Sequence, residues 1–137
     1  MDPITATLDI DDAARRITTR TRAVVAYHWG GWPCDLDALH AFGRAHGLRV
    51  IEDVGESLGA TWRGRAVGGP GGDLAAFSFG AVRHLTTIEG GAVTAHRPDE
   101  VERARWLRKY SIHQPSFRDA SGEIDAASDI REIGFLS

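Results

Sequence analysis

Four short apolar segments, separated by polar or glycine-rich stretches, constrain the fold of this chain more than any other feature. The first, Ala23–His28, reads AVVAYH and contains two valines and a tyrosine, which is typical of a buried strand. Arg49–Asp53, Leu74–Ser78 and Gly91–Ala95 are similarly short and apolar. We therefore predict four strands at these positions.

A helical pattern fills the space between the first two predicted strands. Leu36, Leu39 and Phe42 recur at helical spacing on one face, Asp35 precedes them as an N-cap, and Gly47 suits a C-terminal cap. A second helix is predicted within PDEVERARWLRKYS, after the last strand, and the remaining C-terminal residues are predicted to be mainly loop. Strands that alternate with helices favour an α/β fold with a mostly parallel sheet. The 137 residues suit a single domain.

Composition narrows the class of protein. The chain is 42% hydrophobic and 26% charged, with a formal net charge of −3, which is typical of a soluble globular protein and gives no sign of a nucleic-acid or membrane surface. The one cysteine rules out an internal disulfide. Because the sequence has no long apolar run and no signal-peptide pattern, we expect a cytoplasmic protein.

Polar residues follow the predicted strands, at the edge where open α/β sheets place their sites. His28, Asp53 and Ser78 end three of the strands, and Glu56 follows shortly after the second. A single polar residue there is more often a turn former than a ligand, but several on neighbouring strands indicate a site.

Other polar residues carry weaker signals. The six histidines have no metal-ligand spacing, so no metal site is expected. His40 and His46, on the first predicted helix, are expected at the surface. Cys34 has no partner motif and is interpreted as structural. The GGPGG loop does not follow a dinucleotide-binding pattern.

Several longer motifs, in order, resemble one protein family. VIEDVGESLGA, GGDLAAFSFGAVRHLTTIEGGAV and WLRKYSI resemble signature segments of the DegT/DnrJ/StrS family of sugar aminotransferases, which use pyridoxal phosphate. The resemblance runs over nearly the whole chain. It implies the large domain of a fold-type I aminotransferase, in which these four strands are neighbours in chain order and the last one is antiparallel.

The resemblance also implies roles for individual residues. Asp53 matches the aspartate that pairs with the pyridine nitrogen of the cofactor, and Ser78 matches a serine that contacts its phosphate. Glu56 matches a glutamine beside the ring, and His28 matches a supporting histidine. Arg83 stands where the family has the lysine that forms the Schiff base with the cofactor.

Arg83 changes the expected chemistry. A Schiff base needs a primary amine that can lose its proton, whereas a guanidinium stays protonated in proteins. We therefore expect no transaminase activity and no bound cofactor, with Asp53 and Ser78 as vestigial cofactor positions. Ile88 stands where the family usually has glycine, so the loop there is expected to be altered.

The resemblance further indicates a truncated large domain without the family's small domain. The chain begins at a position that resembles the middle of the large domain, so flanking strands and helices are expected to be missing. Unpaired edge strands and uncovered sheet faces invite association. We therefore expect a homo-oligomer, first of all a homodimer, or a complex with a full-length aminotransferase.

Three functions are compatible with these features. The leading hypothesis is acid–base chemistry without cofactor, such as cyclisation, isomerisation or dehydration of a small biosynthetic intermediate; its catalytic residues would be Asp53, Glu56, His84, Arg83 and His28. The second is a non-catalytic partner or scaffold of a full-length aminotransferase. The third is non-covalent use of pyridoxal or pyridoxamine phosphate, and a gene remnant without function is a further possibility.

The two carboxylates offer a criterion between these hypotheses. Asp53 and Glu56 are three residues apart, and in a partly dry cleft one of them should hold its proton towards neutral pH. Arg83 opposes this effect. If Arg83 lies within a few Å, the group is more a structural salt-bridge network than a catalytic site.

Overall fold

The computed structural model describes residues 1–108, 111–112, 114–125, 128, 132 and 134. The chain divides into two compact units, Met1–His96 and Arg97–Ser137. The single-domain organisation expected for residues 1–137 stays a prediction.

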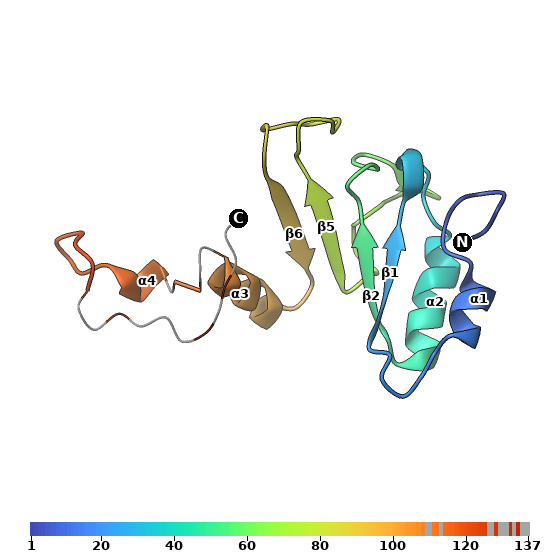
Figure 1. The fold of residues 1–137 in the computed structure, drawn as a ribbon, viewed down its shortest axis with the longest axis horizontal. Coiled ribbons are helices and arrows are strands. Elements are labelled where there is room, and N and C mark those ends of the chain that lie inside the picture. Colours follow the sequence, from blue (N-terminus) through green and yellow to red (C-terminus); the bar gives the residue numbers. More distant parts are fainter. Residues whose placement is uncertain (109–110, 113, 126–127, 129–131, 133, 135–137) are drawn as a thin grey trace. The chain divides into compact units, whose positions relative to one another are not determined.

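The first unit is built on a four-stranded sheet (Figure 1). Its strands β1 (Ala23–Tyr27), β2 (Arg49–Asp53), β5 (Leu74–Ser78) and β6 (Gly91–Ala95) lie side by side in that order. β1, β2 and β5 are parallel, and β6 is antiparallel to β5. The predicted strands, their order and the α/β class are confirmed; β1 ends one residue earlier than predicted, at Tyr27.

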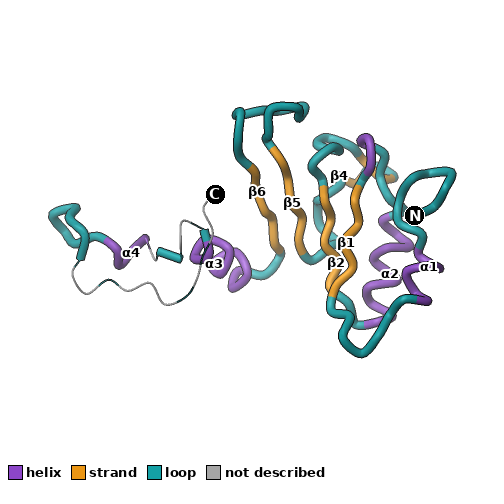
Figure 2. The backbone as a smooth tube through the Cα atoms, in the orientation of Figure 1, coloured by secondary structure: helices purple, strands orange, loops and turns teal. Residues whose placement is uncertain are grey.

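Helices α1 (Ile10–Arg15) and α2 (Leu36–His46) lie next to each other beside β1 and β2 (Figure 2). α2 begins as predicted, because Asp35 Oδ1 accepts a hydrogen bond from Ala38 N at 3.0 Å. It ends at Gly47, which has a φ of 62°, in the left-handed region that favours glycine. The sequence analysis did not predict α1, which is capped by Asp9. The remaining short elements are η1 (Trp29–Gly31), β3 (Thr61–Trp62) and β4 (Arg65–Ala66).

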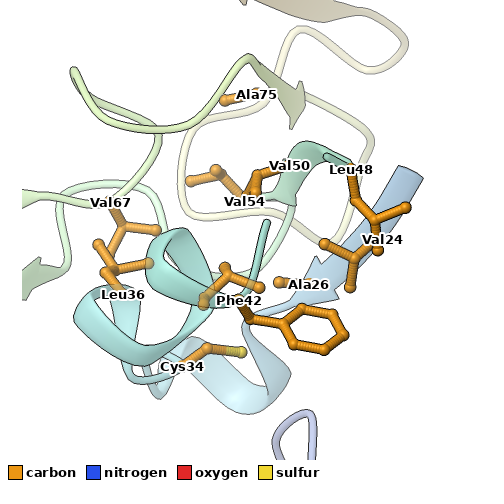
Figure 3. Packing of buried hydrophobic residues seen from close by; sticks show 11 residues of the cluster. Val24, Ala26, Cys34, Leu36, Phe42, Leu48, Val50, Val54, Val67 and Ala75 are labelled. Atoms are coloured by element: carbon orange, nitrogen blue, oxygen red, sulfur yellow. The ribbon is translucent and has the colours of Figure 1, made fainter. Parts of the chain in front are cut away.

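The hydrophobic core lies between α2 and one face of the sheet (Figure 3). Alternate residues of β1, Val24 and Ala26, are buried there together with Leu39 and Phe42 of α2. Gly43 lets the helix come close to β2, since a Cβ at this position would lie 2.5 Å from Val50 Cγ2. The alternation of strand residues therefore assigns one face of the sheet to the core.

The opposite face of the sheet is less covered. Cross-strand pairing places four residues of this face in one row: Val25, Ile51, Leu74 and Ala95. Val25, at one end of the row, is 58% exposed. Among the described residues, β1 and β6 form the two edges of the sheet. Parallel sheets are normally covered on both faces.

The second unit contains α3 (Pro98–Leu107) and α4 (Gln114–Phe117). Pro98 occupies the first turn of α3, where a missing N–H costs no helical hydrogen bond. The predicted helix is confirmed up to Leu107, and part of its predicted last turn lies outside the described residues. Across the described parts of the chain, no helix combines the length and apolar character needed to span a membrane.

Candidate functional site

The polar residues singled out by the sequence lie around the carboxyl ends of the parallel strands. β1, β2 and β5 end at the same edge of the sheet, and the loop of residues 79–90 lies at this edge (Figure 1). Phe79 N donates a hydrogen bond of 2.8 Å to Gly90 O, and Thr87 N donates one of 2.9 Å to Phe79 O. Backbone hydrogen bonds within the loop therefore hold its two ends together.

An ion pair occupies the centre of this edge. Arg83 Nη1 lies 3.1 Å from Glu56 Oε1, and Arg83 Nε donates to Ser78 Oγ at 3.4 Å. Gly30 N donates to Glu56 Oε2 at 2.9 Å. The Arg83 and Glu56 side chains are 27% and 32% exposed. Together these contacts join the segments that follow β1, β2 and β5.

Glu56 is ionised at neutral pH in this setting. Hydrogen bonds from Gly30 N and the Tyr27 hydroxyl, together with the Arg83 guanidinium, hold the pKa of Glu56 below its usual value, although burial opposes this shift. The expectation that one carboxyl group keeps its proton towards neutral pH therefore fails for Glu56. By the criterion set out above, the 3.1 Å contact with Arg83 favours a structural salt-bridge network.

Asp53 lies beside this ion pair. Its Oδ1 accepts a hydrogen bond from Gly55 N at 3.0 Å. A Cβ placed on Gly55 would lie 3.1 Å from Asp53 Oδ1, 3.5 Å from Ser78 Cβ and 3.9 Å from Arg83 Cζ. Asp53, Ser78 and Arg83 thus converge on one point. In the described part of the chain, no salt bridge is formed by Asp53.

Two predicted catalytic residues are not brought to this group. The His28 side chain is fully buried, and its Nε2 lies 3.3 Å from Glu52 Oε2. Its Nδ1 accepts a hydrogen bond from Cys34 N at 3.0 Å, so both ring nitrogens have protein partners. His84 follows Arg83 but is exposed. We therefore leave His28 and His84 out of the candidate site.

The sequence analysis missed a buried cluster around Glu52, which we call the Glu52 cluster: Glu52, His28, His40 and the N–H of Gly68. Glu52 is only 1% exposed, its Oε1 lies 3.3 Å from His40 Nε2, and its Oε2 accepts from Gly68 N at 2.9 Å. The expectation that His40 lies at the surface is wrong, since it is 6% exposed. His46 is exposed as expected.

The protonation of the Glu52 cluster follows from its hydrogen bonds. Burial raises the pKa of Glu52, but the hydrogen bonds from His28, Gly68 and His40 outweigh burial and bring this pKa below its usual value. Because Nδ1 of His28 accepts from Cys34 N, its Nε2 carries the proton that is donated to Glu52. A signal for this cluster was present in the sequence: Glu52 alternates with Val50 and Val54, which belong to the core.

Cys34 is 3% exposed, in agreement with a structural interpretation. No group of three or more histidine, cysteine, aspartate or glutamate side chains that could hold a metal ion occurs among the residues that the structure describes.

Ile88 has an unusual backbone conformation. Its φ is 73°, in the left-handed region that β-branched residues rarely adopt, and its side chain is 77% exposed. The sequence resemblance expects glycine at this position, and the backbone of Ile88 takes a conformation that suits glycine.

Ile88→Gly is expected to raise the free energy of unfolding by about 0.5–1 kcal/mol. Glycine has no Cβ, so the substitution relieves the steric strain of the left-handed backbone. Glycine also makes the unfolded chain more flexible, but this entropy cost is smaller than the strain that is relieved. Urea denaturation followed by circular dichroism measures the change. Ile88→Ala is the matched control: it removes most of the exposed side chain but keeps Cβ. Equal effects of the two variants would contradict the assignment of the strain to the backbone.

Comparisons with known proteins agree with this architecture. Residues 1–135 match the model of the DegT/DnrJ/EryC1/StrS aminotransferase family. The chain belongs to this family. Its structure is similar to the crystal structure of the sugar aminotransferase CalS13 from Micromonospora echinospora, with a TM-score of 0.84 and 36% identity, over 98% of this chain and 37% of that chain.

Curated relatives of this family are much longer. The chain is 40% identical over 117 residues to the dTDP-3-amino-3,4,6-trideoxy-alpha-D-glucose transaminase of Streptomyces venezuelae, covering 85% of this chain and 31% of the relative. It is 33% identical over 135 residues to the uncharacterized protein MJ1066 of Methanocaldococcus jannaschii, covering 98% and 35%. The chain thus spans about a third of the length of the curated relatives it matches.

The family implies pyridoxal phosphate, and the residues at this edge do not fit its covalent attachment. Arg83 offers a guanidinium, which cannot form a Schiff base. This guanidinium is already engaged by Glu56 and Ser78. The vestigial roles of Asp53 and Ser78 remain predictions from the resemblance.

Proposed function

We propose that this chain is a family member without transaminase activity that acts as a non-catalytic partner of a full-length aminotransferase in amino-sugar biosynthesis. The observation that carries this proposal is the ion pair between Arg83 and Glu56 at 3.1 Å. It places a permanently charged group where the resemblance expects the reactive lysine, and it holds Glu56 as a carboxylate. The guanidinium keeps its proton at neutral pH, and the lowered pKa of Glu56 makes its carboxylate a weaker base.

The comparisons support the biosynthetic context. One relative acts on a dTDP-linked sugar according to its name, and CalS13 is a sugar aminotransferase. A partner with the same architecture would carry the lysine that this chain lacks. Sequence analysis ranked acid–base chemistry first; the ion pair moves the partner function ahead of it.

The cofactor provides the first test. The purified protein, mixed with pyridoxal phosphate, is expected to show no Schiff-base absorption band and no borohydride-reducible adduct at residue 83. Arg83→Lys is expected to give no transaminase turnover either, because the neighbouring Glu56 carboxylate favours the charged ammonium form of a lysine. The Streptomyces venezuelae transaminase is the positive control. Turnover by the wild type or by Arg83→Lys would overturn the proposal.

The partner provides the second test. The chain is mixed with a full-length aminotransferase of this family encoded in the same genome, and complex formation is followed by size-exclusion chromatography with light scattering. We expect a complex and a changed kcat/KM of the aminotransferase for its sugar substrate. Separate elution together with an unchanged kcat/KM would contradict a partner function.

Acid–base chemistry remains the second candidate, because Asp53 lies at the same edge without a salt bridge in the described residues. Under this alternative the chain alone would convert a nucleotide-linked keto sugar, and Asp53→Asn would lower that activity by roughly 100-fold or more. Product analysis by mass spectrometry separates the two candidates. Conversion by the isolated chain would favour Asp53 as the acid–base group.

A further inference from the structure

The chain makes a tight turn at residues 28–34, between β1 and α2, which we call the 28–34 turn. It contains η1 and follows β1 directly, so it lies at the edge of the sheet that carries the candidate site. Gly30 and Gly31 have φ values of 59° and 82°, in the left-handed region that glycine adopts without steric cost. These two glycines let the backbone reverse its direction within a few residues.

His28 fixes this turn at both ends. Its backbone N donates to Asp53 O at 3.3 Å, and its carbonyl O accepts from Gly31 N at 3.3 Å. Its Nδ1 accepts a hydrogen bond of 3.0 Å from Cys34 N, at the far end of the turn. Its Nε2 lies 3.3 Å from Oε2 of the buried Glu52. One buried side chain therefore closes the turn and ties it to the core.

The closed turn contacts Glu56 at two points. Gly30 N donates to Glu56 Oε2 at 2.9 Å, and this hydrogen bond contributes most to the lowered pKa of Glu56. A Cβ placed on Gly31 would lie 3.1 Å from the backbone O of Glu56, so the turn also packs against the backbone of this residue. The other carboxylate oxygen, Oε1, lies 3.1 Å from Arg83 Nη1. Gly30 N thus orients the carboxylate that pairs with Arg83.

We propose that His28 is a positioning residue for the ion pair between Arg83 and Glu56, and that it acts through the 28–34 turn. The ring closes the turn, the closed turn presents Gly30 N to Glu56, and the oriented carboxylate holds Arg83. The two ring nitrogens of His28 bind Cys34 N and Glu52, so its effect on the ion pair is indirect. This role does not depend on the partner function proposed above, because it concerns only how the ion pair is held.

The two ring nitrogens of His28 can be tested separately. Nδ1 closes the turn through Cys34 N, whereas Nε2 binds Glu52. Asparagine carries its amide oxygen one bond from Cγ, as histidine carries Nδ1, so His28→Asn keeps an acceptor for Cys34 N. Glutamine carries its amide one bond further out, so His28→Gln keeps a donor for Glu52 and leaves Cys34 N without its acceptor. Positioning through the turn requires only the group at Nδ1.

The pKa of Glu56 is the first readout, measured on the whole chain from the carboxyl ¹³C shift as a function of pH. In the wild type this pKa lies below the ordinary value of 4.5. We expect His28→Asn to keep it lowered and His28→Gln to raise it towards 4.5, because Gly30 N moves away from the carboxylate. The amide proton of Gly30 should titrate with Glu56 in the wild type, and Glu56→Gln should abolish this titration.

Chemical modification of Arg83 gives a second readout near neutral pH. Phenylglyoxal reacts with guanidinium groups, and peptide mass spectrometry gives the rate at each arginine. His28→Gln is expected to raise the rate at Arg83 by roughly 2- to 10-fold, the factor for the loss of one hydrogen bond, whereas His28→Asn should keep the wild-type rate. Arg16, which pairs with Asp12 of α1, is the internal control and should react equally in all variants.

The pattern across the two variants separates positioning from a general loss of stability, which urea denaturation measures alongside. Wild-type values of both readouts in His28→Asn, with both shifted in His28→Gln, support the proposal even where the two variants are equally destabilised. A folded His28→Gln variant with wild-type readouts, or equal shifts in both variants, would overturn it. If His28→Gln does not fold, His28→Asn decides: unchanged readouts support the proposal, and shifted ones refute it.

Discussion

Replacing Glu52 with alanine is expected to lower the free energy of unfolding by about 3–5 kcal/mol, because it leaves several buried hydrogen-bond donors without an acceptor, at about 1–3 kcal/mol for each donor. Glu52 is 1% exposed and accepts from the Nε2 atoms of His28 and His40 and from Gly68 N. Without the carboxylate, these donors are left in the core without an acceptor. Urea denaturation followed by circular dichroism measures the loss.

Glu56→Ala is the natural control for this variant. It also removes a glutamate that accepts a backbone hydrogen bond, but its side chain is 32% exposed, so water can replace the lost contacts. The loss for Glu56→Ala should be clearly smaller. If both variants lowered the free energy of unfolding equally, the buried Glu52 cluster would contribute no more to stability than the partly exposed contacts of Glu56.

Acid titration gives a second readout of the same cluster. The pKa of Glu52 is lowered from its ordinary value of 4.5 in the folded chain. The contribution of the Glu52 carboxylate to the free energy of unfolding is therefore fully present above about pH 4.5, and it is lost as the pH falls through the pKa of the folded state. Glu52→Gln removes this titration, so the stability difference between wild type and variant should shrink below pH 4.5.

Gly68→Ala is expected to lower the free energy of unfolding by about 2–5 kcal/mol. This loss combines the overpacking caused by the new Cβ with the strain of a left-handed backbone at a residue other than glycine. Gly68 has a φ of 71°, and a Cβ there would lie 2.8 Å from Phe77 Cζ and 2.9 Å from Val54 Cγ2. The same residue donates its N–H to Glu52, so a shift of the loop would also disturb the buried cluster. Thermal and urea unfolding measure the loss.

Gly64→Ala separates the two causes. Gly64 has a φ of 78°, close to that of Gly68, but a Cβ there would meet no atom within 4 Å. Gly64→Ala should therefore lower the free energy of unfolding only by the strain of the left-handed backbone, about 1–2 kcal/mol. If Gly64→Ala were as destabilising as Gly68→Ala, close packing around Gly68 would not explain the effect.

Much of the fold could be predicted because its signals are local. The apolar segments predicted the four strands, and Asp35 and Gly47 marked the ends of α2. Caps and strand propensities depend on neighbours within a few residues. The short helix α1 was missed, since six residues are too few for a clear helical period and none of its side chains is fully buried, although Ile10 and Ala13 pack against the core.

The candidate site was predicted in part. Sequence analysis grouped Asp53, Glu56 and Arg83, and the structure places them at one edge with Ser78. It also grouped His28 and His84 with them, although His28 turns to Glu52. The position of a residue near a strand end predicts that its backbone lies at the site. The direction of its side chain depends on the packing around it, which the sequence does not show.

By itself the sequence determined the chemistry available at residue 83, because a guanidinium stays charged whatever surrounds it. It also determined the alternation of apolar segments that makes the sheet. Only the tertiary structure decided what the neighbouring acids Glu52 and Asp53 do. Side chains of adjacent strand residues point to opposite faces, so pairing with Ala26 and Ala75 puts Glu52 on the side of α2 and the histidines, while Asp53 lies on the open side with Tyr27. One position along β2 therefore separates a buried structural carboxylate from one at the candidate site.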